Sequence, residues 1–422
     1  MKNAPLLLTS DTMVVQPHIR PMGRTPHIKI HAFCETQSLA VSIQKVKDDR
    51  RFRRAGTEIS QGGIAAAIAY CTHHPTPDVL ILESPATKSE LLAALGDLAS
   101  VCDEKTKVIV VGASNDITLY RELMDSGIAE YLVTPVNPLA IMATILRFFS
   151  ETSAVRIGKV CAVVGCKGGT GASVLAQNLA AMMSQQGMPT MLADLDLSFG
   201  TAALNYNIDS PIGFAEQLPE ADRLDAALLE RLLFKHGPHL SVLPGPTAAH
   251  ICVEPDGEVI SKLIALAQSM FPHVLLDLSH TWSPMVRSVL ESADDIILVA
   301  EPDLAGLRNA RCLFDFFKAT RPNDPQPRLV LNKVGLPKRK EITPAQFAAA
   351  LKIPIAGQIG FDPATFSAAA NAGQMIAEAS KHAPAVPVLQ DLARQVLGLP
   401  SPKKRTHLRK LWRRAGTKES AQ

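Results

Sequence analysis

The stretch Val160-Cys-Ala-Val-Val-Gly-Cys-Lys-Gly-Gly-Thr-Gly-Ala-Ser173 decides the fold. Its apolar start has the length and β-branched content of a buried parallel strand, and residues 173–183 have the pattern of a helix. A glycine-rich turn between a strand and a helix is typical of a phosphate-binding loop, where backbone N–H groups and the helix N-terminus face a phosphate. The sequence therefore predicts an α/β domain with a phosphate site at this turn.

The residues of this turn are predicted to bind ATP together with Mg²⁺. They are Lys167, Gly168, Gly169, Thr170, Gly171, Ala172, Ser173 and Val174. The hydroxyl of Ser173 is placed to ligate Mg²⁺. Ala172 stands where such loops usually carry a lysine that touches the outer phosphates. Because one preorganised donor contributes about 3 kcal/mol in a transition state, we expect slow or absent ATP hydrolysis.

Two further apolar runs end in acids. One closes in Asp194 and Asp196, and the other reaches Asp277. Asp277 has the position of a Walker B aspartate, which holds Mg²⁺ through water. The arrangement from Lys167 to Ser173 resembles the loop of the MinD/ParA ATPases, and this resemblance implies that Asp194 supports the Mg²⁺ shell and that Asp196 positions the attacking water; the alternative is that this pair of acids only caps the following turn. Ser279 and His280 come next, and because adjacent strand residues point to opposite faces, a hydrolase triad is disfavoured.

The N-terminal part alternates between predicted strands and helices, which favours a compact doubly wound sheet. The strands are expected at 27–33, 78–83, 107–112 and 130–135, and the helices at 62–70, 89–99, 117–126 and 138–149.

This order resembles a response-regulator receiver domain. Such a domain needs a phosphorylatable aspartate, further acids and a lysine, where this chain has Glu83, Cys34-Glu35 and Thr134. The resemblance therefore implies a degenerate receiver that serves docking or dimerisation; a working phospho-switch and an unrelated Rossmann-like domain are the alternatives.

The Lys167-Gly-Gly-x-Gly-x-Ser arrangement resembles the deviant Walker A motif of the MinD/ParA ATPases. In that family the early lysine reaches the partner's nucleotide across a dimer, which implies a catalytic role for Lys167 beside Asp196. Asn332, at the end of another apolar run, matches the family's adenine-reading asparagine; a plain turn residue is the alternative. Val174 stands where the family often has threonine.

The segments 301–311, 321–324 and 353–376 narrow the resemblance to the CpaE/TadZ branch. This branch implies a nucleotide-binding localisation and scaffold protein for Flp-type (tight adherence) pili, with ATP sandwiched in a homodimer. It further implies pilus or secretion components, including a secretion ATPase, as partners, and a position at the cell pole on the inner membrane. A ParA-type partition ATPase is the alternative, and an electron-transferring relative and a phosphorelay regulator are less favoured.

Charge is distributed unevenly along the 422 residues. The net charge is +3, but residues 401–422 hold eight Lys/Arg and one acid, so the rest of the chain carries 3 − 7 = −4. An acidic body makes nucleic acid an unlikely partner. If the tail is helical, Leu408, Leu411, Trp412 and Ala415 form a narrow apolar stripe among basic residues, which favours peripheral membrane contact; a plain solvated tail is the alternative.

The expected organisation has five parts. These are a flexible leader (1–26), a receiver-like domain (27–150), a linker (151–158), a MinD/ParA-like ATPase domain (159–400) and the basic tail (401–422). The seven cysteines are scattered without a C-x-x-C pair, which suits a reducing cytoplasm. The fold class expected is α/β with two doubly wound sheets, a flavodoxin-like sheet followed by a P-loop NTPase sheet.

Overall fold

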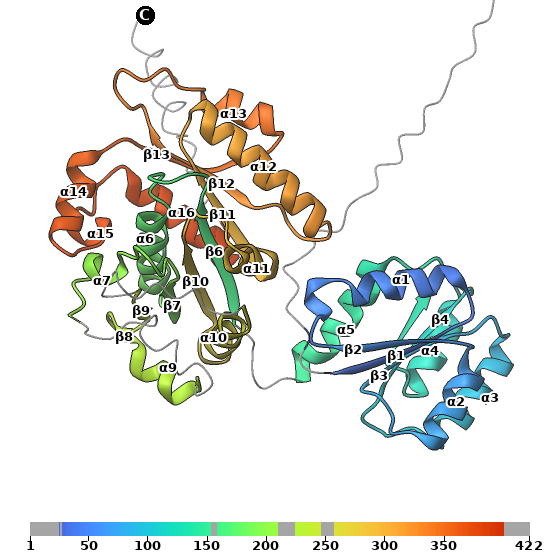
Figure 1. Cartoon of the computed structure of the whole chain (residues 1–422). Helices are drawn as coiled ribbons and strands as arrows, with labels where there is room; N and C mark the ends of the chain where they lie inside the picture. Colours follow the sequence, from blue (N-terminus) through green and yellow to red (C-terminus); the bar gives the residue numbers. More distant parts are fainter. Residues whose placement is uncertain (1–24, 26–27, 153–157, 210–223, 246–256, 401–422) are drawn as a thin grey trace, which may run out of the picture. The chain divides into compact units, whose positions relative to one another are not determined.

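The computed structural model describes residues 25, 28–152, 158–209, 224–245 and 257–400 (Figure 1). The chain divides into two units, Met1–Ser153 and Ala154–Gln422. Each unit is built on its own sheet with helices on both faces. The predicted fold class, two doubly wound α/β sheets, is confirmed. The predicted basic tail lies outside the described residues, as does the predicted leader apart from Thr25, which donates to the carbonyl of Arg51.

The N-terminal sheet has five parallel strands in the order β2-β1-β3-β4-β5. Flavodoxin-like doubly wound folds have this order. The strands are β1 (Lys29–Cys34), β2 (Gly56–Gln61), β3 (Val79–Glu83), β4 (Lys107–Gly112) and β5 (Glu130–Val133).

Helices cover both faces of this sheet. One face carries α1 (Gln37–Lys47), the short η1 (Arg50–Phe52) and α5 (Pro138–Thr152). The other carries α2 (Ile64–His73), α3 (Lys88–Ala99) and α4 (Ile117–Asp125). The sequence analysis missed α1 and β2. Strand β2 is a largely polar edge strand in which only Thr57 is buried, so it gives almost no hydrophobic signal.

The C-terminal sheet has eight strands in the order β13-β12-β11-β6-β10-β7-β9-β8, and only β8 runs antiparallel to its neighbour. The strands are β6 (Lys159–Gly165), β7 (Thr190–Asp194), β8 (Phe234–Lys235), β9 (Leu240–Leu243), β10 (His273–Leu278), β11 (Asp295–Ala300), β12 (Arg328–Val334) and β13 (Ile355–Gly360). The predicted phosphate strand β6 is therefore central, between β10 and β11.

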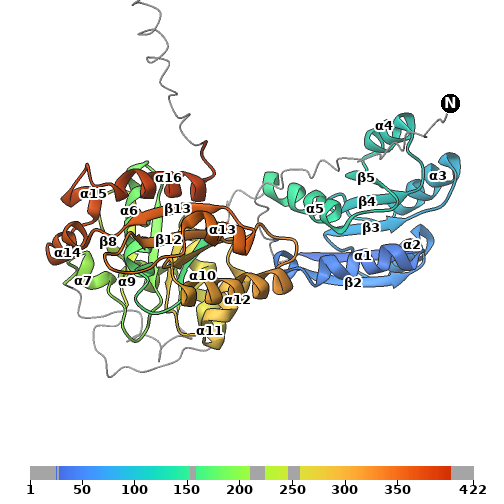
Figure 2. The ribbon, with the colours of Figure 1, turned by 90° about the horizontal axis from the view of Figure 1, so that it is seen from above.

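Two groups of helices enclose this sheet, as Figure 2 shows from above. One face is packed by α9 (Ala226–Leu232), α10 (Gly257–Met270), α11 (Pro284–Ser292), α12 (Leu304–Thr320) and α13 (Pro344–Leu351). The other is packed by α6 (Ala172–Gln185), α7 (Ala202–Asn205), α14 (Pro363–Asn371), α15 (Ile376–Ala379) and α16 (Ala385–Leu397). Because both faces are covered, β6, β10 and β11 read as continuous apolar runs.

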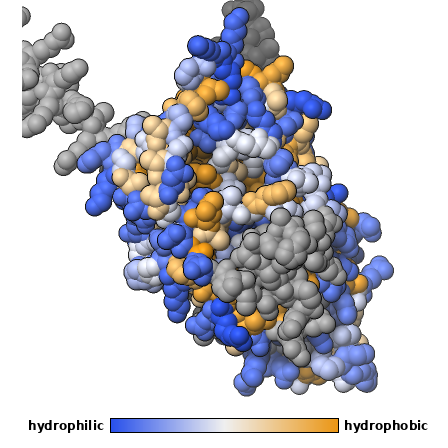
Figure 3. Space-filling model, turned by 60° about the vertical axis from the view of Figure 1, so that its left-hand side comes forward, coloured by the Kyte–Doolittle hydropathy of each residue, from blue (hydrophilic) through white to orange (hydrophobic). Residues whose placement is uncertain are grey.

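One face of the molecule illustrates how surface polarity is distributed. On the face drawn in Figure 3, hydrophobic residues lie in small groups among hydrophilic ones. Among the described helices, none combines the length and the apolar character needed to cross a bilayer.

The polar side chains that were predicted to form the site lie where the parallel strands end, at the carboxyl edge of the C-terminal sheet. Ligands of open α/β sheets bind outside this edge.

Candidate nucleotide-binding site

The turn between β6 and α6 has the backbone of a phosphate loop. Gly169 and Gly171 have φ of 76° and 83°, in the left-handed region that favours glycine. Space also requires glycine at 171, because a Cβ there would lie 2.5 Å from Nδ2 of Asn332. The glycines are thus needed both for the direction of the chain and for the close approach of the Asn332 side chain from β12.

A cavity of about 480 Å³ opens over this turn. Most of the residues predicted to bind nucleotide line it: Lys167, Gly168, Gly169, Thr170, Gly171, Ala172, Ser173, Val174, Asp196 and Asn332. The sequence analysis assigned no site role to the rest of the lining. That part includes Lys333 near the end of β12, Gly360 at the end of β13, and the segment 361–363 with Phe366 after β13. Their positions after strand ends were the available signal, since those ends share one edge of the sheet.

Asn332 and Lys333 brace the loop from β12. Nδ2 of Asn332 donates to the Thr170 carbonyl at 2.7 Å, and its Oδ1 accepts from the N–H of Lys333 at 2.9 Å. The Lys333 ammonium donates to the carbonyl of Gly169. The Asn332 amide is therefore already bonded to backbone on both atoms, and one N–H of its amide group is left for a base. Support of the loop is the role that these contacts establish.

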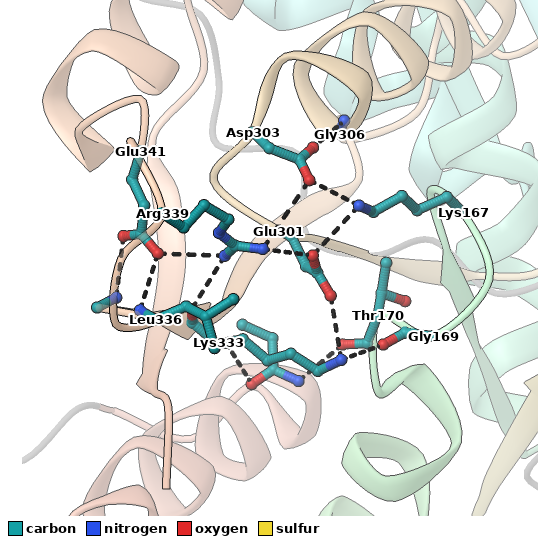
Figure 4. A network of polar contacts seen from close by, with 12 residues as sticks. Lys167, Gly169, Thr170, Glu301, Asp303, Gly306, Lys333, Leu336, Arg339 and Glu341 are labelled. Atoms are coloured by element: carbon teal, nitrogen blue, oxygen red, sulfur yellow. Dashed lines mark hydrogen bonds and ion pairs between the residues drawn. The ribbon is translucent and has the colours of Figure 1, made fainter. Parts of the chain in front are cut away.

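Lys167 is held within its own chain (Figure 4). Its Nζ lies 2.6 Å from Oδ2 of Asp303 and 3.2 Å from Oε2 of Glu301, which lie between the end of β11 and the start of α12. The hydrogen bond to Asp303 is the main reason why the pKa of the Lys167 ammonium is raised. In this structure the early lysine of the loop faces the acids of its own sheet.

Glu301 is shared by three cations. Besides Lys167, Lys333 lies 3.1 Å from its Oε1 and Arg339 lies 2.7 Å from its Oε2. Arg339 also pairs with Glu341 at 3.1 Å. Loss of any one cation would leave the carboxylate with two others, so the network tolerates the departure of Lys167.

Asp194 supports the turn that follows β7. Its Oδ1 accepts from the N–H of Asp196 at 3.1 Å and its Oδ2 from the N–H of Ala202 at 2.9 Å. Burial is the largest influence on its carboxyl and raises the pKa to about 6. Asp196 is partly exposed, lines the cavity, and accepts from the N–H of Phe199 at 3.1 Å. Both acids therefore cap this turn, and Asp196 also faces the cavity.

Asp277 is the acid that fits a cation. Both of its carboxylate oxygens are buried without a hydrogen-bond partner. Burial first, and the nearby charge of Asp194 second, raise its pKa well above the usual range, while the Ser173 side chain acts in the opposite direction. Buried oxygens without partners are costly unless a cation or proton accompanies them. Ser173 and Asp277 are therefore suited to Mg²⁺, which in nucleotide sites uses few protein ligands and takes others from phosphate and water. Within the described residues no group of three or more acidic, histidine or cysteine side chains is placed to hold a metal.

One sequence argument was wrong. Ser279 and His280 were treated as neighbours on a strand, but β10 ends at Leu278 and both residues line the cavity from the loop. The alternation of side chains along a strand does not apply beyond its end. His280 thus belongs to the site, although not as part of a triad with Ser279.

The N-terminal unit has a smaller cavity of about 380 Å³ at the carboxyl edge of its sheet. Thr134 and Glu83 line it, the latter at the end of β3. Oε2 of Glu83 accepts from the N–H groups of Glu35 and Thr36, both at 2.8 Å, and Oε1 accepts from the Thr36 hydroxyl at 2.7 Å. Glu83 therefore ties the end of β3 to the start of α1.

Comparison with known proteins agrees with this arrangement. Residues 158–311 match the family model described as cellulose biosynthesis protein BcsQ. No curated protein matches the chain. Among solved structures, the chain is similar to a ParA family ATPase from Chlorobium tepidum TLS, with 25% identity over 56% of this chain and 98% of that one, at a TM-score of 0.51.

Two other solved structures extend the comparison. A pilus assembly protein CpaE from Caulobacter crescentus CB15 is 44% identical over 30% of this chain and 96% of that one, with a TM-score of 0.29. The septum site-determining protein MinD from Pyrococcus horikoshii OT3, complexed with Mg-ADP, is 21% identical over 57% of this chain and 96% of that one, with a TM-score of 0.50, and shares the fold. The resemblance noted from the sequence is confirmed: the chain carries a domain of the BcsQ and ParA/MinD family, and its structural neighbours include CpaE pilus assembly proteins.

Proposed function

We propose that the C-terminal unit binds ATP with Mg²⁺ and that the bound state acts as an assembly switch for a pilus of the Flp type. The observation that carries this proposal is the cavity over the phosphate loop, together with the buried and unpartnered carboxylate of Asp277 beside Ser173. The pilus role is supported by the identity with CpaE. Occupancy of the site, rather than rapid turnover, carries the signal, because Ala172 supplies no charge to the phosphates.

In this proposal each residue of the site has its own role in binding ATP and Mg²⁺. The N–H groups of the loop and the start of α6 hold the phosphates, and Ser173 and Asp277 would hold Mg²⁺, which supplies charge neutralisation when bound. Asp196 faces the cavity and would orient a water molecule. Lys167 would leave Asp303 to contact the nucleotide of a second copy, so that a homodimer encloses ATP. The N-terminal unit would dock the polar or pilus partner, and a secretion ATPase is one such partner.

The test is nucleotide affinity measured together with oligomeric state. ATP and ADP binding would be measured by calorimetry, and mass by light scattering, with and without Mg²⁺. ATP-dependent dimers with little phosphate release are expected. If the full chain binds neither nucleotide, the proposal is wrong and the loop has only a structural role.

A pair of glycine variants controls for loop geometry. In Gly171→Ala the new Cβ would lie 2.5 Å from Asn332, whereas in Gly187→Ala, at a similar φ of 78°, it would have nothing within 4 Å. Both variants bear the backbone strain of a left-handed alanine, about 1 kcal/mol or more. Gly171→Ala should therefore lose ATP binding, and Gly187→Ala should keep it.

A further inference from the structure

His280 lies over the start of the phosphate loop. A Cβ built on Gly168 would be 3.1 Å from its Nε2 and 3.2 Å from its Cε1, so the ring covers the Cα of this glycine. The residue is exposed and lines the cavity. It comes from the loop after β10, the strand next to β6 on the side away from β12 and β13.

His280 also differs from the other basic side chains of the cavity lining in its contacts. Three residues of the cavity lining can carry a positive charge, namely Lys167, His280 and Lys333. Lys167 is bound by Asp303 and Glu301, and Lys333 by Glu301 and the carbonyl of Gly169. Within the part of the chain that the structure describes, His280 has no hydrogen bond or ion pair. The position where a phosphate loop usually supplies a lysine holds Ala172.

The sheet order gives the cavity a direction. Its apolar lining residues Phe361, Pro363 and Phe366 follow β13, three strands away from β6, whereas His280 follows β10 on the other side of β6. A nucleotide with its base at the apolar end and its phosphates on the loop would extend its last phosphate toward His280.

We propose that His280 donates a hydrogen bond to the terminal phosphate of the bound nucleoside triphosphate. This contact would replace the one that a lysine makes in loops that carry lysine at the position of Ala172. The inference rests on the proposed ATP binding. It requires no change of charge, because a neutral imidazole carries one N–H donor, and a phosphate oxygen is a charged acceptor. His280 is in this view a binding residue that distinguishes a triphosphate from a diphosphate.

The experiment compares the affinities for Mg-ATP and Mg-ADP of the parent chain, His280→Ala and His280→Gln. His382→Ala is the matched control, since His382 is an exposed histidine of the same unit outside the cavity lining. We expect His280→Ala to bind ATP about tenfold more weakly or worse with little change for ADP, because a hydrogen bond to a charged group is lost. His280→Gln, which keeps an N–H donor, should lose less. Adding Ala172→Lys to His280→Ala should restore the preference for ATP.

Two results would overturn the inference. Unchanged ATP affinity in His280→Ala would show that the ring does not reach the phosphate, and equal weakening of ATP and ADP would show that it only supports the loop. If His280→Ala does not fold, His280→Gln takes its place. The ratio of ATP to ADP affinity in His280→Gln is then compared with the ratio in the double variant Ala172→Lys/His280→Gln, and the same two results would overturn the inference. A parent chain that binds neither nucleotide refutes the ATP proposal and this inference with it, whereas a parent that prefers ATP beside an unaffected variant refutes the role of His280 alone.

Discussion

Replacing Glu83 with alanine should loosen the N-terminal unit at one defined place. The carboxylate holds two backbone N–H groups and one hydroxyl at the start of α1. A hydrogen bond to a charged group contributes about 1.5–3 kcal/mol, so three of them would give about 5–9 kcal/mol if nothing replaced them. The cavity of about 380 Å³ beside Glu83 lets water reach the freed groups. We therefore expect a loss of about 3 kcal/mol, and about 1 kcal/mol for Glu83→Gln, which keeps one acceptor.

Hydrogen exchange followed by mass spectrometry would measure this loss in the full chain. A change of 3 kcal/mol corresponds to about 10²-fold lower protection in peptides from α1 (Gln37–Lys47), with peptides from the C-terminal sheet as an internal reference. Glu90→Ala is the matched control, because it removes the carboxylate of the exposed capping box of α3 and should affect that helix rather than α1. If protection of α1 falls no more in Glu83→Ala than in this control, Glu83 does not anchor the helix.

Four further outcomes are expected. Ala172→Lys should raise phosphate release by about 10²-fold, since it restores a charged donor; Ala172→Met controls for bulk, and a lysine variant no faster than the parent would contradict our explanation of slow turnover. Asp303→Asn should favour the ATP-dependent dimer by about fivefold, because it removes a partly buried ion pair of Lys167 worth roughly 1 kcal/mol; light scattering would measure this, and a weaker dimer would argue against release of Lys167. Burial raises the pKa of the Cys166 thiol to about 12, so this thiol stays protonated at pH 8. Iodoacetamide should therefore label the exposed Cys312 first among the described cysteines, as mass spectrometry would show. Preferential labelling of Cys166 would indicate that the loop opens. Deletion of residues 401–422 should reduce sedimentation with anionic vesicles, each lost basic residue near the surface removing up to about 1 kcal/mol, and equal recovery would exclude membrane contact through the tail.

The sequence was sufficient to predict an element where a buried apolar run and characteristic turn residues occur together. Strand β6 and the loop after it were predictable because an apolar run is followed by several glycines, and a turn with left-handed residues requires glycine. Strand β2 was not predictable, since an edge strand with one buried residue lacks an alternating pattern. Helix α1 was missed although Leu39, Ile43 and Val46 have helical spacing, because the polar residues between them lower its mean hydropathy.

The site was predictable in part for the same reason. The residues of the loop could be identified from the spacing of their glycines. The partners of Lys167 follow β11, more than 130 residues later in the chain. No local sequence pattern connects Lys167 with these acids. Asn332 was noticed as a strand-end residue, yet its contact with the Thr170 carbonyl depends on the strand order, in which β12 is separated from β6 by β11 alone. Spatial pairing across the carboxyl edge is a property of strand order, which the local pattern of each run does not contain.

The close approach of Asn332 to Gly171 has an evolutionary consequence. The amide is a spacer of fixed length between β12 and the loop, and the missing side chain at 171 is the space into which it fits. A larger residue at 171 displaces the amide, and a shorter or apolar residue at 332 leaves the Thr170 carbonyl without its donor. Neither position can change alone without disturbing the loop, so lineages of this protein should retain the pair or replace both members together.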